Sequence, residues 1–400
     1  MSAIVCKFGG SAVTKYNAEK IKKIIESDGE RRYAVVSAIG KGYAGQSKIT
    51  DMLIELAALS KTAEDIKELP LYKEISNRHK ELIAACRLNI KAEELMEEAF
   101  LNYKEQGSDF IISRGEYLSG KIISHYLGFA FIDSGNVVSL NEKKQINYAK
   151  SVRALKNALK GRGNALLTGF YGKNGGGIAT FPRGGSDISG AILASAVNAA
   201  FYENYLDVAG LMVISPKIIS YPLTVPHLSY SQMQQINQAG ADVLHRDSVL
   251  PLIKKGIPIK LLNFYNPYDE GTLISKKKAE GLITIAESAG YLYNIFHPST
   301  FEGNKIPKNA LSVRFDRSVC TLIYRQPALK ELSHSYGQCT IAERPCLYTY
   351  LLFSGGVLWE RILESVKASG EEIFYMDVTE NACSIASSRR ISNKLYYDLV

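Results

Sequence analysis

The chain has 400 residues, of which 46% are hydrophobic and 22% charged, a composition typical of a globular protein with a sizeable core and two or three domains. Its formal charge is +8, but Glu or Asp accompanies most lysines, which favours solvated helix faces over a nucleic-acid surface. No apolar run is long enough to span a bilayer, and we expect no secretory leader. The six cysteines form no C-x-x-C pair, so we expect a reduced, cytoplasmic protein.

The first predicted element is a buried strand, Ala3–Phe8, which runs into the glycine turn Gly9–Ser11. Glycines let the backbone approach a bulky anion, and successive N–H groups there can cradle phosphate oxygens. Lys7 lies at the end of the strand and supplies a cation beside that cradle. Phosphoryl transfer is catalysed mainly by positioned positive charge. Taken alone, such a turn is more often purely structural.

The next elements predict an α/β parallel sheet. Asn17–Ser27 has the spacing of a helix, and Tyr33–Ser37 reads as a second buried strand that ends near Gly40. Ligands of such sheets bind beyond the carboxyl ends of the strands. Lys7, the glycine turn and Ser37 are therefore expected along one rim. The following helix begins near Lys48, with Thr50 or Asp51 as its predicted cap.

A long helical region, Leu71–Gly128, contains one acidic residue in an unusual place. Glu116 falls among residues that otherwise look buried, and a buried carboxylate is costly unless it is paired. Two interpretations stay open. Glu116 forms a local ion pair with Arg114 or Lys121, or it receives a cationic group of a ligand.

The most informative stretch lies between Thr168 and Asp187. A glycine-rich segment leads to Arg183-Gly-Gly-Ser-Asp187, which opens a helix of small residues. A helix N-terminus binds anions through its free N–H groups and its dipole, and Arg183 offers a bidentate fork for a carboxylate. The alternative is that Ser186 and Asp187 merely cap the helix. We prefer the anion site, because a cap requires neither the two glycines nor the arginine.

The remaining elements indicate a change of domain. Strands are predicted at Tyr202–Val208, Leu211–Ile214 and Ile257–Asn263, and a helix at Leu228–Ala239. The charged run Lys276–Lys278 then marks the predicted boundary. Beyond it, the order strand, helix, strand, strand, helix over the last part of the chain is typical of a small split α/β sandwich.

These motifs occur in the order seen in aspartokinases, which the chain resembles over residues 1–275. The resemblance is carried by Lys7-Phe-Gly-Gly-Ser11, Ser37-Ala38 with Thr50-Asp51, Arg114-Gly-Glu116, Arg183-Gly-Gly-Ser-Asp187, Leu206-Asp-Val-Ala-Gly210, Gly240-Ala-Asp-Val-Leu-His245, Ile257-Pro-Ile259 and Asn266-Pro267 with Gly271-Thr272. Singly these motifs are weak, but in one order over a whole domain they are strong. Residues 282–400 resemble an ACT-type regulatory region. Its second copy, about 344–400, is easy to see, and its first, within 283–340, is degenerate.

The resemblance implies a fold and an activity. The fold is α/β: an amino-acid-kinase fold with a parallel-rich central sheet between helices, followed by a smaller α+β, ferredoxin-like, ACT-like domain. The activity is the ATP- and Mg²⁺-dependent phosphorylation of the β-carboxylate of L-aspartate to 4-phospho-L-aspartate, the first step towards lysine, threonine and methionine. The nucleophile is a substrate carboxylate, already ionised at neutral pH, so the reaction needs no general base.

The resemblance also implies roles for individual residues. Lys7 neutralises the transferring phosphoryl group, and Asp187 orients the lysine and the metal-bound phosphates. The predicted nucleotide-binding residues are Lys7, Gly9, Gly10, Ser11, Asp207, Met212 and Lys217. The predicted substrate-binding residues are Ser37, Thr50, Glu116, Arg183 and Ser186, with Arg183 on the α-carboxylate and Glu116 on the α-ammonium. No protein metal site is predicted.

The chain departs from the family pattern on the nucleotide side. Leu206 stands for Thr, Met212 for Tyr, Ser215 for Asp, Lys217 for Arg and Asp242 for Lys. A lysine at position 217 keeps the charge of the arginine but loses its planar fork. The substrate-side residues are intact.

Two alternatives stay open beside the aspartokinase reading. One is a kinase of the same fold acting on another small amino acid. The other is a non-catalytic amino-acid-binding regulator with a decayed nucleotide site. ACT-type modules usually bind an amino acid where two of them pair, so we expect a homodimer or a larger homo-oligomer. Lysine or threonine is the expected effector, and inhibition is absent if the degenerate first copy no longer binds it.

Overall fold

The computed structural model describes residues 3–42, 45–181, 185–239, 244 and 246–279, and beyond residue 282 it describes eight strands together with residues 364 and 368. Contacts divide the chain into two compact units. The first comprises Met1–Leu211, Pro226–Tyr230 and Leu244–Lys276, and the second Met212–Val225, Ser231–Val243 and Lys277–Val400. The domain ranges predicted from the sequence, 1–275 and 282–400, remain a proposal.

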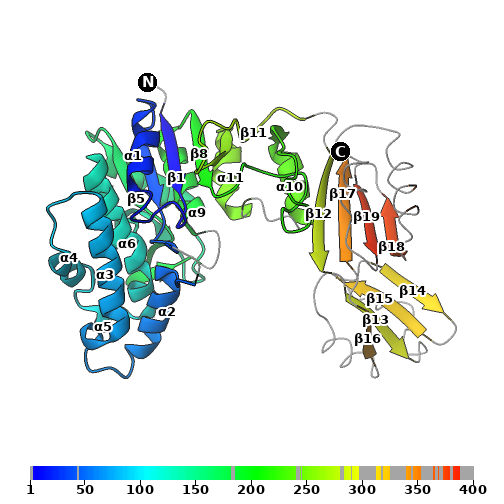
Figure 1. Ribbon diagram of the computed structural model, residues 1–400, viewed down its shortest axis with the longest axis horizontal. Coiled ribbons are helices and arrows are strands. Elements are labelled where there is room, and N and C mark those ends of the chain that lie inside the picture. Colours follow the sequence, from blue (N-terminus) through cyan, green and yellow to red (C-terminus); the bar gives the residue numbers. More distant parts are fainter. Residues whose placement is uncertain are drawn as a thin grey trace. The chain divides into compact units, whose positions relative to one another are not determined.

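An eight-stranded sheet organises the first unit (Figure 1). Its spatial order is β3 (Ala130–Ile132), β5 (Ala165–Thr168), β2 (Tyr33–Val36), β1 (Ile4–Phe8), β8 (Phe201–Leu206), β10 (Ile259–Asn263), β11 (Thr272–Ser275) and β9 (His227–Ser229). Neighbouring strands are parallel except β10 and β11. The central strands are short and almost wholly buried, as expected of parallel strands covered on both faces. The predicted parallel-rich sheet is confirmed.

Helices cover the two faces of this sheet because side chains alternate along each strand. On one face, α6 (Ser108–Leu127) packs against β2, β3 and β5. On the other face, α9 (Gly185–Val197) packs against β1, β2, β5 and β8. Gly190 allows the close approach of α9 to β8, since a Cβ there would lie 2.6 Å from the Tyr202 hydroxyl.

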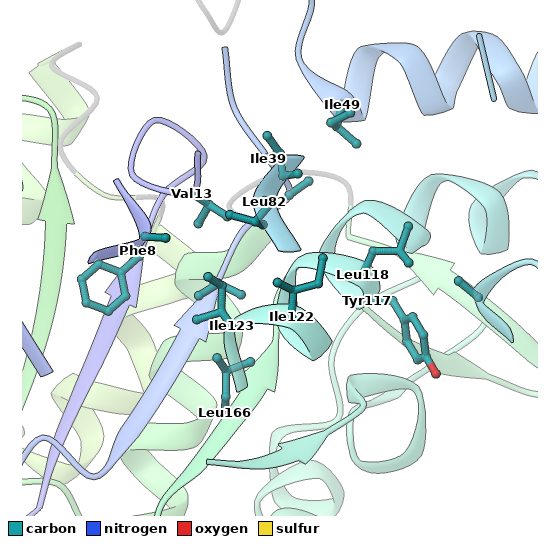
Figure 2. Close-up of a cluster of buried hydrophobic side chains, with 14 of the residues drawn as sticks. Phe8, Val13, Ile39, Ile49, Leu82, Tyr117, Leu118, Ile122, Ile123 and Leu166 are labelled. Carbon is teal, nitrogen blue, oxygen red and sulfur yellow. The ribbon is translucent and has the colours of Figure 1, made fainter. Parts of the chain in front are cut away.

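A core of buried hydrophobic side chains lies on the α6 side of the sheet. Phe8 stacks on Tyr205 of the neighbouring strand with ring centroids 4.9 Å apart. Figure 2 shows Phe8, Ile122, Ile123 and Leu166 converging between the sheet and α6. The other helices of this side are α1 (Ala18–Glu26), α2 (Ile49–Leu59), α3 (Pro70–Ala85), α4 (Ala92–Ala99) and α5 (Tyr103–Gln106), with a short 3-10 turn at Ile66–Glu68. This core fixes the position of α6.

Three local features differ from the sequence-based expectation. Neither Thr50 nor Asp51 caps α2: the helix begins at Ile49, with Lys48 as its cap residue and no side-chain cap bond. The glycine-rich stretch after Thr168 is a hairpin of β6 (Tyr171–Asn174) and β7 (Gly177–Thr180) rather than a loop, and β4 (Ser139–Leu140) extends it to three strands. Leu211–Ile214 is not a strand but carries one isolated bridge, from Met212 to Thr224.

The remaining helices of the described segments are α7 (Ser134–Val137), α8 (Tyr148–Leu159), α10 (Tyr230–Ala239) and α11 (Arg246–Lys255). Among the helices that the structure describes, none combines the length and apolar character needed to cross a membrane.

The second unit contains two antiparallel four-stranded sheets. One has the order β12 (Ile283–Ala289), β17 (Cys346–Leu352), β19 (Ala382–Ser387) and β18 (Ile373–Val378). The other has the order β14 (Ser312–Asp316), β15 (Val319–Tyr324), β13 (Tyr291–Phe296) and β16 (Cys339–Glu343). The strand at Ile283–Ala289 therefore pairs with the C-terminal segment and not with its immediate neighbours in sequence. The helices predicted at Val357–Ala368 and Ile391–Leu399 lie almost wholly outside the described residues.

Candidate active site

A buried ion pair lies at the carboxyl end of the central strands. Lys7 Nζ contacts Asp187 Oδ1 at 2.7 Å, and the lysine is only 8% exposed. The lysine comes from β1 and the aspartate from the first turn of α9, which lies over the same face of the sheet. A buried cation without a partner would be costly, so this carboxylate both holds the lysine and fixes where its charge lies.

The glycine turn after β1 is packed against the loop after β2. A Cβ on Gly40 would lie 2.1 Å from the carbonyl oxygen of Gly10, and one on Gly10 would lie 3.1 Å from the carbonyl oxygen of Ala38. Only glycines therefore allow the two loops to approach so closely. A Cβ on Gly9 would lie 3.8 Å from Lys7 Nζ, so the turn and the lysine are neighbours. Backbone amides beside a fixed cation suit the phosphates of a nucleotide.

A pair of serines lies next to the ion pair. Ser37, which directly follows β2, donates from its hydroxyl to the Ser186 hydroxyl at 2.9 Å. Ser186 precedes Asp187 in α9, so the two contacts are made from one helical turn. The loop after β5 also reaches this point, because a Cβ on Gly169 would lie 2.3 Å from Ser186 Oγ. Three strand ends thus meet at the beginning of α9.

Glu116 reaches the same region from the opposite face of the sheet. The side chain is 4% exposed, and its Oε2 has no hydrogen-bond partner among the described residues. Neither proposed local ion pair forms: Arg114 bonds to Ser113 and Phe110, and Lys121 pairs with Glu98. The local ion-pair interpretation is therefore wrong.

The environment of Glu116 keeps its carboxyl group protonated near neutral pH. Burial raises the pKa of Glu116 to about 8, and backbone hydrogen bonds, one of them from Ala38, together with the charge of Arg114, lower it only in part. The neighbouring Gly115 packs against Ala38, which follows Ser37. A Cβ on Gly115 would lie 2.8 Å from the Cβ of Ala38. A carboxyl group is thus held beside the serine pair, with no ion-pair partner among the residues that the structure describes.

The structure places the other predicted site residues differently. Thr50 is half-buried in the first turn of α2. The preceding residue, Ile49, packs against Gly115, the neighbour of Glu116. Asp207 is exposed and directly follows β8, at the same rim as Lys7. Arg183 lies outside the described residues, as does Asp242. Met212, half-buried, and Lys217, exposed, belong to the second unit.

Two residues that sequence reasoning missed hold this region in place. Asn204 on β8 donates from Nδ2 to Asp187 Oδ1 at 3.1 Å. Arg78 on α3, 5% exposed, donates to the carbonyl oxygens of Gly40 and Ser47 and so holds the loop after β2. Each has a signal in the sequence. Asn204 follows Glu203 in a strand whose other residues are aromatic or aliphatic, and Arg78 lies on the apolar face of a helix, but neither signal identifies the partner.

A cavity of about 630 Å³ opens beside Arg78, between the loop after β1 and helix α3. Thr14, Ile39 and Gln46 are among its lining residues, but none of the predicted site residues lines it. The arrangement of charges, rather than the size of this cavity, therefore identifies the site.

The chemistry of the site follows from its charges. A fixed lysine beside a glycine turn suits transferring phosphates. A buried carboxyl group with no cationic partner among the described residues, beside two hydroxyls, suits the ammonium of a small zwitterion. Within the described residues, no three His, Cys, Asp or Glu side chains gather as metal ligands.

Comparisons with known proteins show which family the chain matches. The model of the amino acid kinase family matches residues 2–263. Aspartokinase 3 of Bacillus subtilis is 29% identical over 307 residues, which cover 72% of this chain and 67% of that protein. The chain spans between about half and two thirds of the length of the first three curated relatives that it matches.

Solved structures resemble the chain over nearly its whole length. The aspartate kinase of Clostridium acetobutylicum has a TM-score of 0.84 and 26% identity, and covers 100% of this chain and 99% of its own. Aspartokinase III of Escherichia coli, solved in complex with aspartate and ADP, has a TM-score of 0.72 at 19% identity, with 96% of each chain covered. At that identity the likeness concerns the fold alone.

Proposed function

This chain belongs to the amino acid kinase family, and from that premise we propose that it is an aspartokinase, which phosphorylates the β-carboxylate of L-aspartate with ATP. The observation that carries the proposal is the meeting of Lys7–Asp187 and Ser37–Ser186 at one helical turn, with the unpaired Glu116 beside them. Relatives named aspartokinase and a matching aspartate kinase structure support the same reaction.

We assign the two halves of the site to the two substrates. The glycine turn and Lys7 bind the nucleotide phosphates, and the ammonium of Lys7 neutralises the charge that develops on the transferring group. Ser37, Ser186 and Glu116 bind aspartate, with Glu116 on its α-ammonium. Thr50 lines the same pocket, and Arg183 takes the α-carboxylate, as the family motif implies.

The reaction needs little proton chemistry from the protein. The attacking oxygen belongs to a carboxylate that is ionised at neutral pH, so positioning and charge supply the catalysis. Magnesium enters as the Mg–ATP complex. Because Mg²⁺ keeps several waters and binds through one or two carboxylates and phosphates, the single carboxylate of Asp187 fits a role in orienting such a complex.

The nucleotide side also includes residues that follow β8. We propose that Asp207, Met212 and Lys217 contact the nucleotide, as their places in the family motif imply. Lys217 then binds as a point charge where the usual arginine would form two parallel bonds.

Regulation and assembly belong to the same proposal. The two four-stranded sheets of the second unit are suited to a pair of ACT-like modules, which bind lysine or threonine as an effector and pair in a homodimer or a larger homo-oligomer. Cys6 and Cys86 are free and buried, and we place the enzyme in the cytoplasm.

A hydroxamate assay tests the catalytic proposal. With L-aspartate, ATP and Mg²⁺, the wild-type protein should form aspartyl hydroxamate, and Lys7→Ala should reduce the rate at least a hundredfold. Lys15→Ala is the matched control, because Lys15 pairs with Glu81 on the surface and should keep the rate. A panel of other small amino acids tests the choice of substrate. No product above the Lys7→Ala background with any of them would exclude kinase function.

A further inference from the structure

We propose that Asn204 is a positioning residue for phosphoryl transfer, and that its side-chain amide holds the Asp187 carboxylate in the orientation that pairs with Lys7. The inference rests on the kinase function proposed above and adds a residue that the family motifs do not include. Asn204 and Lys7 are direct register partners on the neighbouring parallel strands β8 and β1. Their side chains therefore leave the same face of the sheet, the face that α9 covers.

The contacts converge on one carboxylate oxygen. Asn204 Nδ2 donates to Asp187 Oδ1 at 3.1 Å, and Lys7 Nζ contacts the same oxygen at 2.7 Å. The aspartate is the most exposed of the three, with 24% of its side chain accessible. One contact to a lysine leaves a carboxylate free to rotate, whereas two donors on one oxygen hold it. The second oxygen, Oδ2, then remains for the phosphate or metal side of a ligand.

The identity of the residue at position 204 has no other explanation in the described structure. Asn204 is wholly buried, and burying an amide costs free energy unless it is bonded. Its own Oδ1 has no partner among the described residues, so the bond to Asp187 is what the amide contributes. By contrast, the neighbouring buried Glu203 forms an ion pair with Arg31 and accepts a hydrogen bond from Tyr205 on the other face of the sheet.

The charge of Asp187 also determines which end of the amide faces it. With the opposite amide orientation, Oδ1 of Asn204 would face the carboxylate oxygen, and two acceptors would repel. Asn204 therefore acts as a donor. Ser37–Ser186 and Glu116, which we assign to aspartate, are held by other contacts. Loss of the Asn204 donor should consequently lower kcat and leave the KM for aspartate nearly unchanged.

Two substitutions of similar shape test the inference in the full-length protein, with ADP release measured at saturating ATP. Asn204→Leu should lower kcat about tenfold at every pH, with the KM for aspartate changed less than about twofold. Asn204→Asp should be equally impaired at pH 8, where two carboxylates repel. It should recover towards wild type as the pH falls below about 6, because a protonated carboxyl at position 204 can donate again.

Tyr205→Phe is the matched control, since it removes a buried hydroxyl bond from the opposite face of the same strand. It should keep kcat even if it lowers the melting temperature. The inference is overturned if Asn204→Leu keeps the wild-type kcat. It is equally overturned if Asn204→Asp follows the wild-type pH profile, a test that stands even if the leucine variant does not fold. A wild-type protein without kinase activity would instead refute the proposed function, and the inference with it.

Discussion

Glu116 shows how one residue can report on ligand binding. The sequence left open whether its carboxylate is paired locally, and the structure shows that neither Arg114 nor Lys121 is its partner. Burial raises the pKa of its carboxyl group, and the α-ammonium of a bound amino acid would supply a counter-charge that the described residues do not.

We predict that aspartate binding releases about one proton near pH 7. The pKa of Glu116 is raised to about 8 in the free protein, and a bound ammonium would lower it, so the group ionises on binding. Because the complex holds fewer protons, the affinity should rise as the pH is raised towards about 8 and then level off.

Calorimetry in buffers of different ionisation enthalpy measures this release directly. Glu116→Gln should bind aspartate more weakly, without proton release and without that rise in affinity. A wild-type protein that binds aspartate with no exchange of protons at pH 7 would contradict the assignment of Glu116 to the ammonium.

At the scale of elements, the site depends on loops that meet at strand ends. The loop after β2 is held from two sides: Gly40 packs against the glycine turn, and Arg78 of α3 binds the carbonyl oxygens of Gly40 and Ser47. The phosphate cradle is thus not a property of the first glycine turn alone.

We expect Gly40→Ala to damage nucleotide binding. Its methyl group would lie 2.1 Å from the Gly10 carbonyl oxygen, so the glycine turn beside Lys7 must shift. The KM for ATP should rise at least tenfold, with a smaller change in the KM for aspartate. Gly29→Ala is the control, because no atom lies within 4 Å of its built Cβ. Equal kinetics for both variants would show that the loop contact has no role.

Helix α6 connects two parts of the substrate side. Asp109, in its first turn, accepts from Thr180 at 2.9 Å and from Lys144 at 2.6 Å. Glu116 lies two turns further along the same helix, and Thr180 ends the strand that leads to Arg183. We therefore expect the bond between Asp109 and Thr180 to couple the two predicted ends of the aspartate site.

Thr180→Val should raise the KM for aspartate about fivefold with little change in kcat. The matched control is Lys144→Ala, which removes the other partner of Asp109 and should leave the KM within about twofold. Initial-rate measurements at saturating ATP separate the two outcomes. If both variants change the KM for aspartate equally, the Asp109 carboxylate contributes only to local stability.

At the scale of the whole molecule, two segments of the predicted kinase domain belong to the second unit. Residues 212–225 and 231–243 group with the C-terminal part of the chain. Ile285 donates to the Val213 carbonyl oxygen at 2.7 Å, and the Gln232 side chain forms bonds with Ala279 at 2.8 and 3.0 Å. A simple cut near residue 276 would remove these partners.

We therefore predict that a fragment ending at Lys276 is cleaved by trypsin within 212–243 much faster than the full chain, because local opening there costs less free energy. Cleavage within 108–127, which lies in the core of the first unit, should stay equally slow in both. Limited proteolysis with mass spectrometry measures both rates. If residues 212–243 are cleaved equally slowly in the fragment and in the full chain, the assignment of this segment to the second unit is wrong.

The sequence by itself determined the strand with its glycine turn, the cation beside it, the Arg-Gly-Gly-Ser-Asp helix start and the α/β class. These features depend on local chemistry: the geometry of glycines, the charge of helix termini and the apolar runs of buried strands. They also depend on the order of motifs along the chain. The positions of β1, β2, β8, β10, α1 and α10 followed for the same reason. The cap of α2, the hairpin at Tyr171–Thr180 and the irregular backbone at Leu211–Ile214 did not.

The tertiary structure alone decided which groups are partners. Asn204 lies beside Lys7 only because β8 is the parallel neighbour of β1. Within the described part of the chain, Glu116 has no cationic partner because Arg114 and Lys121 contact other groups. The pairings of β8 with β1 and of Lys7 with Asp187 join residues far apart in the chain, and local patterns carry no information on them. They arise from the register of the sheet and the packing of α6 and α9 on its two faces.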